Sequence, residues 1–189
     1  MSPCDGETLS GDAAFVHPVQ NGVLAAVIDA LGHGPDAHRL SVQLTEALLR
    51  WLAEESSPRP EKALEVLDES ARETRGAVAT VAWLNGNTFQ GSAAGIGNVR
   101  CRLFGTVKRD VEFGDGVLGQ RMRTPRSNLF TLQPADTVML FSDGVISRFS
   151  ADDYPTLGLD SAPAVAFNIV RRFRRGTDDA SCVVLRCRG

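Results

Sequence analysis

The chain has 189 residues, of which 43% are hydrophobic and 23% are charged, and its formal net charge is −3. These values predict one domain, residues 1–189, with a sizeable core, and the mild negative charge argues against a chain-wide nucleic-acid surface. The apolar runs fall far short of the ~20 residues that cross a bilayer. The polar start differs from a secretory signal, and the four cysteines form no CxxC pair. We therefore expect a cytoplasmic protein with no membrane or nucleic-acid partner.

The first half of the chain predicts two strands followed by two helices. Residues 15–19 and 23–29 read as two strands joined around Asn21-Gly22, which is a strong hairpin signal. Apolar residues then recur at helical spacing from Pro35 to about Glu55. After a proline-rich break at residues 57–60, a second amphipathic pattern ends near Gly76. These two helices should form one layer.

The second half predicts further strands and one helix. Residues 77–84, 88–94, 99–104 and 107–113 read as strands whose connections are too short for crossover helices, so they must pair antiparallel. Strands at 137–142 and 180–186 flank a helix between about Ser161 and Gly176. The expected class is α+β, with antiparallel sheets in the middle and helices outside. Residues 114–127, rich in Gly and Arg, form the longest irregular stretch and are expected to be the most mobile.

Acidic residues stand at the ends of several of these strands. Asp29 and Asp143 each follow an apolar strand, while Asp12 and the pair at 178–179 each precede one. Carboxylates delivered by separate strand ends can form an oxygen-rich site of the kind that Mn²⁺ or Mg²⁺ prefers. Two such ions ~4 Å apart can clamp a phosphoryl group during in-line attack. Asp29 is the best candidate for a shared ligand, although an acid leaving a strand can also simply cap the next helix.

Five motifs in one order give the chain a resemblance to a known family. They are Ser10-Gly11-Asp12, residues 29–34, Gly95-Ile96-Gly97-Asn98, residues 140–144 and residues 176–180. The sequence resembles the metal-dependent protein phosphatases of the protein phosphatase 2C type, in the bacterial branch named for the stage II sporulation E phosphatase. It is most similar there to short stand-alone feedback phosphatases of the stressosome. The resemblance implies a sandwich of two antiparallel β-sheets packed together with flanking helices.

The resemblance also implies roles for single residues. Asp29 would bridge two Mn²⁺ or Mg²⁺ ions, with the carbonyl of Ala30 helping to bind one of them. Asp143 and Asp178 would hold the other ion, and Asp12 would reach the second metal directly or through a water. The implied catalytic residues are therefore Asp29, Asp143 and Asp178, and Asp179 takes a supporting role. The implied reaction is hydrolysis of phosphoserine or phosphothreonine by a metal-activated water, on a regulatory protein of a stressosome or anti-sigma-factor circuit.

Two departures from the family leave the general acid and the phosphate contact open. Larger relatives carry a histidine where this chain has Leu31, so His33 either protonates the leaving oxygen or hydrogen-bonds the turn, and we favour the turn. The phosphate-gripping arginine of those relatives has no counterpart before Asp12. The arginines of the long loop could replace it because guanidinium groups bind phosphate bidentately, or they could simply be solvated: Arg121, Arg123 and Arg126.

Two other function classes compete with the phosphatase. A catalytically silent module of the same fold could bind a phosphorylated partner, but such a module has no need to keep Asp29, Asp143 and Asp178 together. A metal-dependent hydrolase of small phosphoesters is the third reading, and no signature of a small-ligand pocket supports it. The sequence leaves the oligomeric state open.

Overall fold

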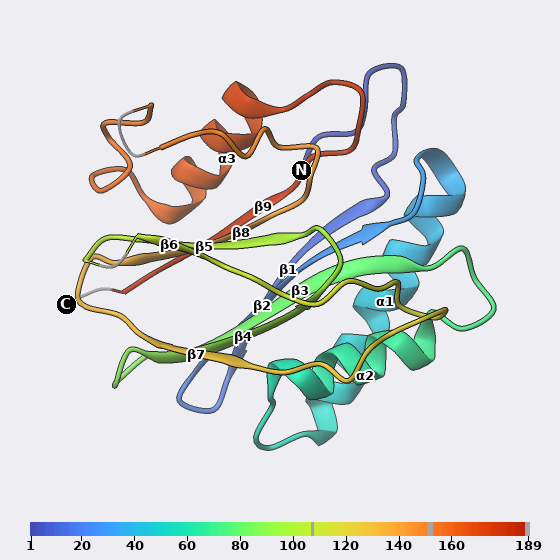
Figure 1. Cartoon of the computed structure of the whole chain (residues 1–189), viewed down its shortest axis with the longest axis horizontal. Helices are drawn as coiled ribbons and strands as arrows, with labels where there is room; N and C mark the ends of the chain where they lie inside the picture. The colour runs from blue at the N-terminus through green and yellow to red at the C-terminus, as the bar shows by residue number, and fades with distance from the viewer. Residues whose placement is uncertain (107, 151–152, 188–189) are drawn as a thin grey trace.

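The computed structural model describes residues 1–106, 108–150 and 153–187 and contains two antiparallel sheets with helices on their outer faces (Figure 1). This arrangement confirms the expected α+β class. The first sheet has the strand order β1 (Asp12–Val19), β2 (Gly22–Ala30), β3 (Ala77–Asn85), β4 (Gln90–Ile96) and β7 (Asn128–Thr131). The second sheet has the order β6 (Arg109–Val111), β5 (Arg100–Phe104), β8 (Thr137–Phe141) and β9 (Cys182–Arg186). The helices are α1 (Gly34–Glu54), α2 (Pro60–Ser70) and α3 (Ala162–Phe173).

Strand β2 lies in the middle of the molecule because both of its faces are apolar. The β1–β2 hairpin turns at Asn21, which has φ 60°, as the Asn-Gly signal predicts. Leu24 and Ile28 face helices α1 and α2, whereas Val27 faces the second sheet. All three side chains are fully buried. Because side chains alternate along a strand, one sequence run serves two separate cores.

Helices α1 and α2 cover the outer face of the five-stranded sheet (Figure 1). Pro35 stands in the first turn of α1, and Pro60 begins α2, where a missing N–H costs nothing. The apolar stripe of α1 includes Leu40, Leu44 and Leu48, spaced four residues apart and buried against the sheet. The helical layer therefore forms as the periodicity predicts.

Helix α3 covers the outer face of the four-stranded sheet (Figure 1). The hydroxyl of Ser161 accepts a hydrogen bond from the backbone N–H of Ala164 at 3.4 Å, which caps the start of the helix. Strand β9 packs Cys182 against α3, while Cys187, just after the strand, packs between the sheets. Both thiols are free and lie on opposite faces, as their spacing predicts.

The long loop is better anchored than its composition suggests. Leu118 is fully buried, and its backbone N–H donates to the carbonyl of Ala77 at 2.8 Å. The N–H of Gly119 donates to the Asp68 carboxylate at 2.8 Å. Strand β7, which follows this loop, was not predicted from the sequence. The strand expected at 107–113 is present as β6, and residue 107 lies outside the described residues.

Within the described part of the chain, none of the helices combines the length and the apolar character that a membrane crossing requires.

Candidate metal centre

Both sheets end in carboxylates at the same end of the molecule. Asp29 lies near the end of β2, directly opposite Asp12 of β1 in the strand register. Both side chains lie on the face of the first sheet that carries Val27 and is turned toward the second sheet. Asp143 follows β8, and Asp178 precedes β9. An open pocket of about 550 Å³ lies there, lined by Asp29, Leu31, Gly32, His33, Val78, Gly97, Asn98, Asp115, Gly116, Asp143, Thr177 and Asp178.

Asp12 is the most deeply buried acid of this group, with only 3% of its surface exposed. One carboxylate oxygen accepts a hydrogen bond from the hydroxyl of Ser142 at 2.6 Å. The Ser142 oxygen in turn accepts from the backbone N–H of Ser181 at 2.9 Å. The contact between Asp12 and Ser142 therefore joins the two sheets. The other oxygen of Asp12, Oδ1, is buried and has no hydrogen-bond partner. A buried acceptor without a donor is costly, so this oxygen is available to a cation.

Asp143 and Asp178 are half-buried at the pocket wall. The amide Nδ2 of Asn98 donates to Asp143 Oδ2 at 2.7 Å, which fixes the orientation of that carboxylate. One oxygen of Asp178 accepts from the backbone N–H of Asp179 at 2.9 Å. The role of Asn98 was not predicted, although its motif was among the five singled out.

Asp179 holds the start of the chain through two hydrogen bonds to its backbone. Its two carboxylate oxygens accept hydrogen bonds from the backbone N–H groups of Cys4, at 2.8 Å, and Gly11, at 2.6 Å. Gly11 immediately precedes Asp12, so this contact positions the first acidic motif. Asp179 is 2% exposed. The supporting role in metal binding that the resemblance implies for Asp179 stays a prediction.

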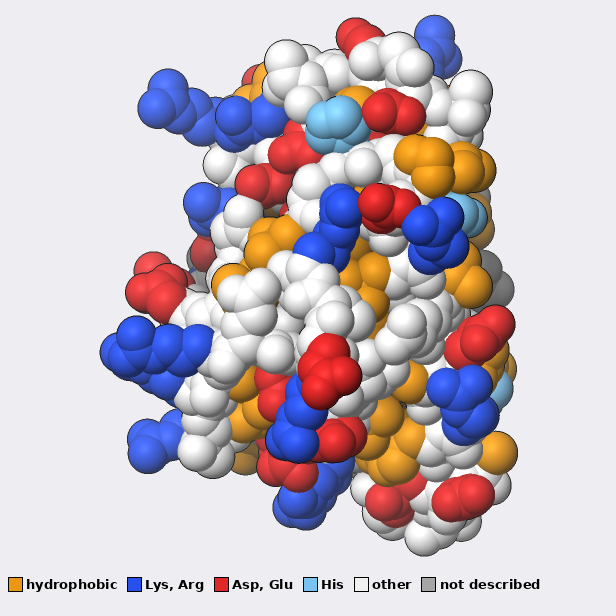
Figure 2. All heavy atoms as spheres, turned by 90° about the vertical axis from the view of Figure 1, so that its right-hand side faces the viewer, with side chains coloured by type: hydrophobic (Ala, Val, Ile, Leu, Met, Phe, Trp, Pro, Cys, Tyr) orange, Lys and Arg blue, Asp and Glu red, His pale blue; other side chains and the backbone are white. Residues whose placement is uncertain are grey.

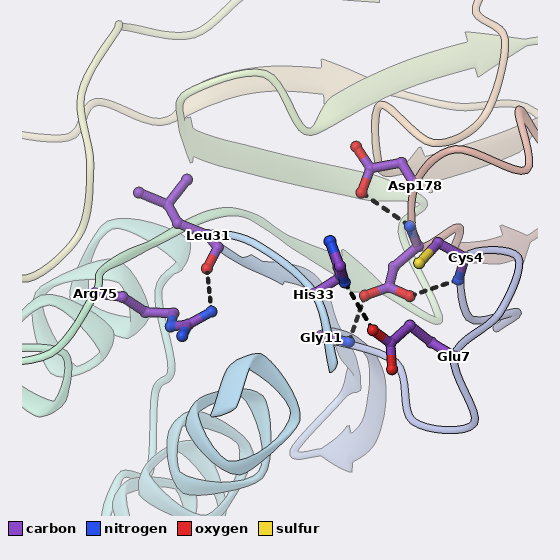
Figure 3. A network of polar contacts seen from close by, with 8 residues as sticks. Cys4, Glu7, Gly11, Leu31, His33, Arg75 and Asp178 are labelled. Carbon is purple, nitrogen blue, oxygen red and sulfur yellow. Dashed lines mark hydrogen bonds and ion pairs between the residues drawn. The ribbon is translucent and has the colours of Figure 1, made fainter. Parts of the chain in front are cut away.

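Two further contacts border the pocket (Figure 3). His33 Nδ1 lies 2.9 Å from Glu7 Oε1, so its partner is a side chain of the N-terminal segment and not the backbone of its own turn. The Arg75 guanidinium donates to the carbonyl of Leu31 at 3.0 Å and holds the turn that follows Asp29. Neither Glu7 nor Arg75 was singled out from the sequence, because their contacts join distant segments.

Two glycines are required by the close approach of the backbone. A Cβ atom on Gly144 would lie 1.9 Å from the carbonyl oxygen of Asp179, so only glycine lets the loops after β8 and before β9 meet. Gly32 has φ +83°, which L side chains rarely adopt. These positions let the acids of separate strands converge.

Burial and mutual repulsion raise the pKa of the central acids. Desolvation, followed by the charges of Asp12, Asp143 and Asp178, raises the pKa of Asp29 to about 9. Desolvation also raises the pKa of Asp12 to about 7, although the Ser142 hydrogen bond opposes this shift. The pKa of Asp143 is raised by burial and by Asp178, while the Arg175 charge lowers it. Such a cluster favours a bound cation, which would remove the repulsion.

The donor set fits Mg²⁺ or Mn²⁺ held partly by water. All the acids are hard oxygen donors, and Oδ1 of Asp12 lacks a partner. The carboxylates are not drawn into a closed cage: among the described residues, no group of three or more His, Cys, Asp and Glu side chains could hold an ion as it stands. Mg²⁺ keeps several waters and needs only one or two carboxylates, so an open arrangement suits it.

The arginines of the long loop do not line this pocket. Arg121, Arg123 and Arg126 are exposed, and none of them is among its lining residues. Arg175, by contrast, lies close enough for its charge to act on Asp143. In Figure 2 acidic and basic side chains are interspersed over the face that is on the right in Figure 1.

A larger hollow of about 720 Å³ lies between α1 and α2. Its basic and acidic side chains pair with one another, as in Lys62 and Glu65 with their charged atoms 2.6 Å apart. Its acids, Glu55, Glu65 and Glu69, stand among basic residues, whereas no lysine or arginine is among the described residues that line the acidic pocket, so the acidic pocket is the candidate site.

Solved structures share this fold at low sequence identity. A chain from a bacterial stressosome system, adapted to control secondary messenger signaling, is 23% identical with a TM-score of 0.85, covering 97% of this chain and 95% of the other. RsbX in complex with magnesium is 19% identical with a TM-score of 0.79, covering 96% and 89%. The serine/threonine phosphatase PstP/Ppp of Mycobacterium tuberculosis is 15% identical with a TM-score of 0.76, covering 99% and 96%. At these identities the likeness shows the fold alone.

Comparison with curated proteins finds no match. The family described as Stage II sporulation protein E, in contrast, matches residues 20–188, which is nearly the whole chain. The matched residues include Asp29 of β2, Asp143 after β8 and Asp178 before β9. The chain therefore belongs to the stage II sporulation protein E family, and its fold is that of the bacterial phosphatases of the protein phosphatase 2C type.

Proposed function

We propose that the protein is a metal-dependent serine/threonine phosphatase that acts on a phosphorylated regulatory protein of a bacterial stress-signalling circuit. The observation that carries this proposal is the convergence of Asp12, Asp29, Asp143 and Asp178 at one end of both sheets, with an unpartnered oxygen on Asp12. The structural likeness to a stressosome chain and to RsbX supports the choice of circuit.

Each acid has a distinct task in this proposal. Asp29 lies centrally, surrounded by the other carboxylates, and would be shared between two Mn²⁺ or Mg²⁺ ions with help from the carbonyl of Ala30. Asp143 and Asp178 would hold one ion from the second sheet, and Asp12 would contribute through Oδ1. When bound, the metals would polarise a water for attack on phosphorus and neutralise charge on the phosphoryl oxygens.

The remaining residues of the site position these groups. Asn98 orients Asp143, Ser142 orients Asp12, and Asp179 fixes the backbone on which Asp12 stands. His33 lies at the pocket wall and is oriented by Glu7. In this role it would donate a proton to the leaving serine or threonine oxygen, or fix the pocket wall by its contact with Glu7.

The test is hydrolysis of p-nitrophenyl phosphate and of a phosphoserine peptide with Mn²⁺, with Mg²⁺ and with a chelator. Metal-dependent turnover that disappears in Asp29→Asn supports the proposal. The control is Glu46→Gln, which neutralises an exposed acid of α1 outside the pocket and should keep full activity. A folded protein that binds the phosphopeptide but shows no turnover with either metal would contradict the proposal and favour a silent binding module.

A further inference from the structure

The rim of the acidic pocket continues into the C-terminal end of α3. The backbone N–H of Arg175 donates to the carbonyl of Gly144 at 2.8 Å, and the N–H of Ile146 donates to the carbonyl of Phe173 at 2.7 Å. The segment that follows Asp143 therefore runs antiparallel beside residues 173–175. A group on either segment stands next to the place where a substrate would bind.

Several arginines lie on these two segments, and they differ in how they are used. Arg174 pairs with Asp5 and Ser2, and the Arg172 guanidinium lies 5.2 Å from the centre of the Tyr154 ring. The others have exposed side chains that make no hydrogen bond, ion pair or ring contact with any residue that the structure describes: Arg148, Arg171 and Arg175.

The helix end alone does not explain this set. Arg171 can complement the negative C-terminal end of α3, but Arg175 lies beyond the helix and Arg148 belongs to another segment. Two exposed apolar side chains lie among them: Phe167, one turn before Arg171 on α3, is 65% exposed, and Ile146 is 41% exposed. Unpaired cations around apolar side chains are typical of a surface that receives another protein chain.

We propose that this basic patch, formed by Arg148, Arg171 and Arg175 with Ile146 and Phe167, docks an acidic segment of the phosphoprotein substrate beside its phosphorylated residue. The proposal rests on the phosphatase function and says which substrate sequences the patch would favour. Guanidinium groups bind carboxylates bidentately, so acids flanking the phosphorylated residue would meet the three arginines. The hydrogen bonds between residues 173–175 and the segment after Asp143 place the patch beside the pocket.

Charge complementarity argues for an acidic peptide as the occupant. The chain as a whole has a net charge of −3, so three unpaired arginines at one rim are a local departure. A long polyanion such as a nucleic acid would also have to pass over the carboxylates of the pocket, which repel it. A short acidic segment can keep its carboxylates over the arginines and present only its phosphorylated residue to the pocket.

The experiment compares two phosphoserine peptides of equal length, one flanked by Asp and Glu and one flanked by Lys. The wild-type protein should show a kcat/KM about tenfold higher for the acidic peptide, since each exposed ion pair contributes only modestly. The triple variant Arg148→Ala/Arg171→Ala/Arg175→Ala should lose this preference through KM. The double variant Arg148→Ala/Arg171→Ala keeps the Arg175 charge near Asp143, and it should lose most of the preference while p-nitrophenyl phosphate hydrolysis stays unchanged. The control Arg50→Ala/Arg59→Ala removes exposed arginines of the α1–α2 layer and should keep the preference.

A binding measurement separates failure of docking from failure of catalysis. Fluorescein-labelled versions of both peptides are titrated with Asp29→Asn and followed by anisotropy. Tighter binding of the acidic peptide that weakens with rising salt and is lost in the triple variant supports docking even if no turnover occurs. Equal binding of the two peptides, or a preference that survives the triple variant, overturns it. If the triple variant melts early, Arg175→Ala alone carries the same comparison.

Discussion

Strand β2 has an apolar middle and an acidic end, and the two are stabilised in different ways. In the middle, Leu24 and Val27 are fully buried and pack in separate cores on opposite faces. At the end, Asp29 is buried and faces other carboxylates, and its pKa is raised first by desolvation and then by their charges. Burial of the apolar middle stabilises the fold, whereas burial of the acid at the end destabilises it. A bound cation would offset that cost. One strand thus supplies both the stability of the fold and its chemistry.

Asp29→Asn should separate these two contributions most strongly. Activity should fall about a thousandfold or more, because metal assistance contributes several kcal/mol to the rate. The metal-free variant should instead melt about 3–5 °C higher than the wild type, since an amide removes the cost of a buried repelled acid. Calorimetry in the presence of chelator measures this, and a lower melting temperature would contradict the repulsion.

Leu24→Ala should have the opposite profile. Loss of a fully buried leucine should reduce the free energy of unfolding by about 2–5 kcal/mol, while kcat per folded molecule stays close to wild type. Leu129→Ala is the matched control, because Leu129 is 78% exposed and should change stability by less than about 0.5 kcal/mol. Urea titrations measure both variants. Similar losses in the two variants would show that the packing of β2 is not the main source of stability.

Asp179→Asn should affect the acidic end alone, and by less. An amide has one oxygen and cannot accept from both Cys4 and Gly11, so one backbone N–H loses its partner at a cost of about 1–3 kcal/mol. Because Gly11 precedes Asp12, we expect metal affinity to fall about tenfold. Isothermal titration with Mn²⁺ measures this affinity. An unchanged affinity together with reduced stability would confine Asp179 to a structural role.

The pH dependence of the metal-free protein is the most diagnostic effect. The folded pKa values of Asp29, about 9, and Asp12, about 7, exceed the ordinary value of 3.8, so the folded state binds more protons than the unfolded state between these limits. Stability should therefore fall as pH rises from about 4 to about 9, by at most about 1.4 kcal/mol per pH unit for each group. Melting curves should show this slope, and Mn²⁺ or Asp29→Asn should flatten it. A stability that rises over this range would rule the effect out.

The buried apolar elements could be predicted from the sequence, whereas many contacts of the acidic site could not. The continuous apolar run of β2 and the helical spacing of α1 reflect burial, which leaves a local pattern in the sequence. Asp12, Asp29, Asp143 and Asp178 were found because each stands at a strand end in a distinctive turn. The metal roles assigned to them stay predictions, as do the phosphate contacts proposed for the loop arginines.

What the sequence missed depends on contacts between distant segments. Asn98 meets Asp143, Glu7 meets His33 and Arg75 meets the turn after Asp29 without any local pattern that would indicate the partner. Strand β7 has four residues, of which Leu129 is largely exposed, so its alternation is too short to detect. It forms because β4 offers a free edge.

Because Asp179 accepts hydrogen bonds from both Cys4 and Gly11, docking of the N-terminal segment is coupled to the position of Asp12 and would thereby be coupled to metal binding. If a bound ion favours the ordered position of Asp12, it must favour the docked N-terminal segment by the same free energy, and the reverse holds as well. A protein that captures this segment would therefore weaken metal binding without touching the pocket, and abundant metal would protect the segment from capture or proteolysis.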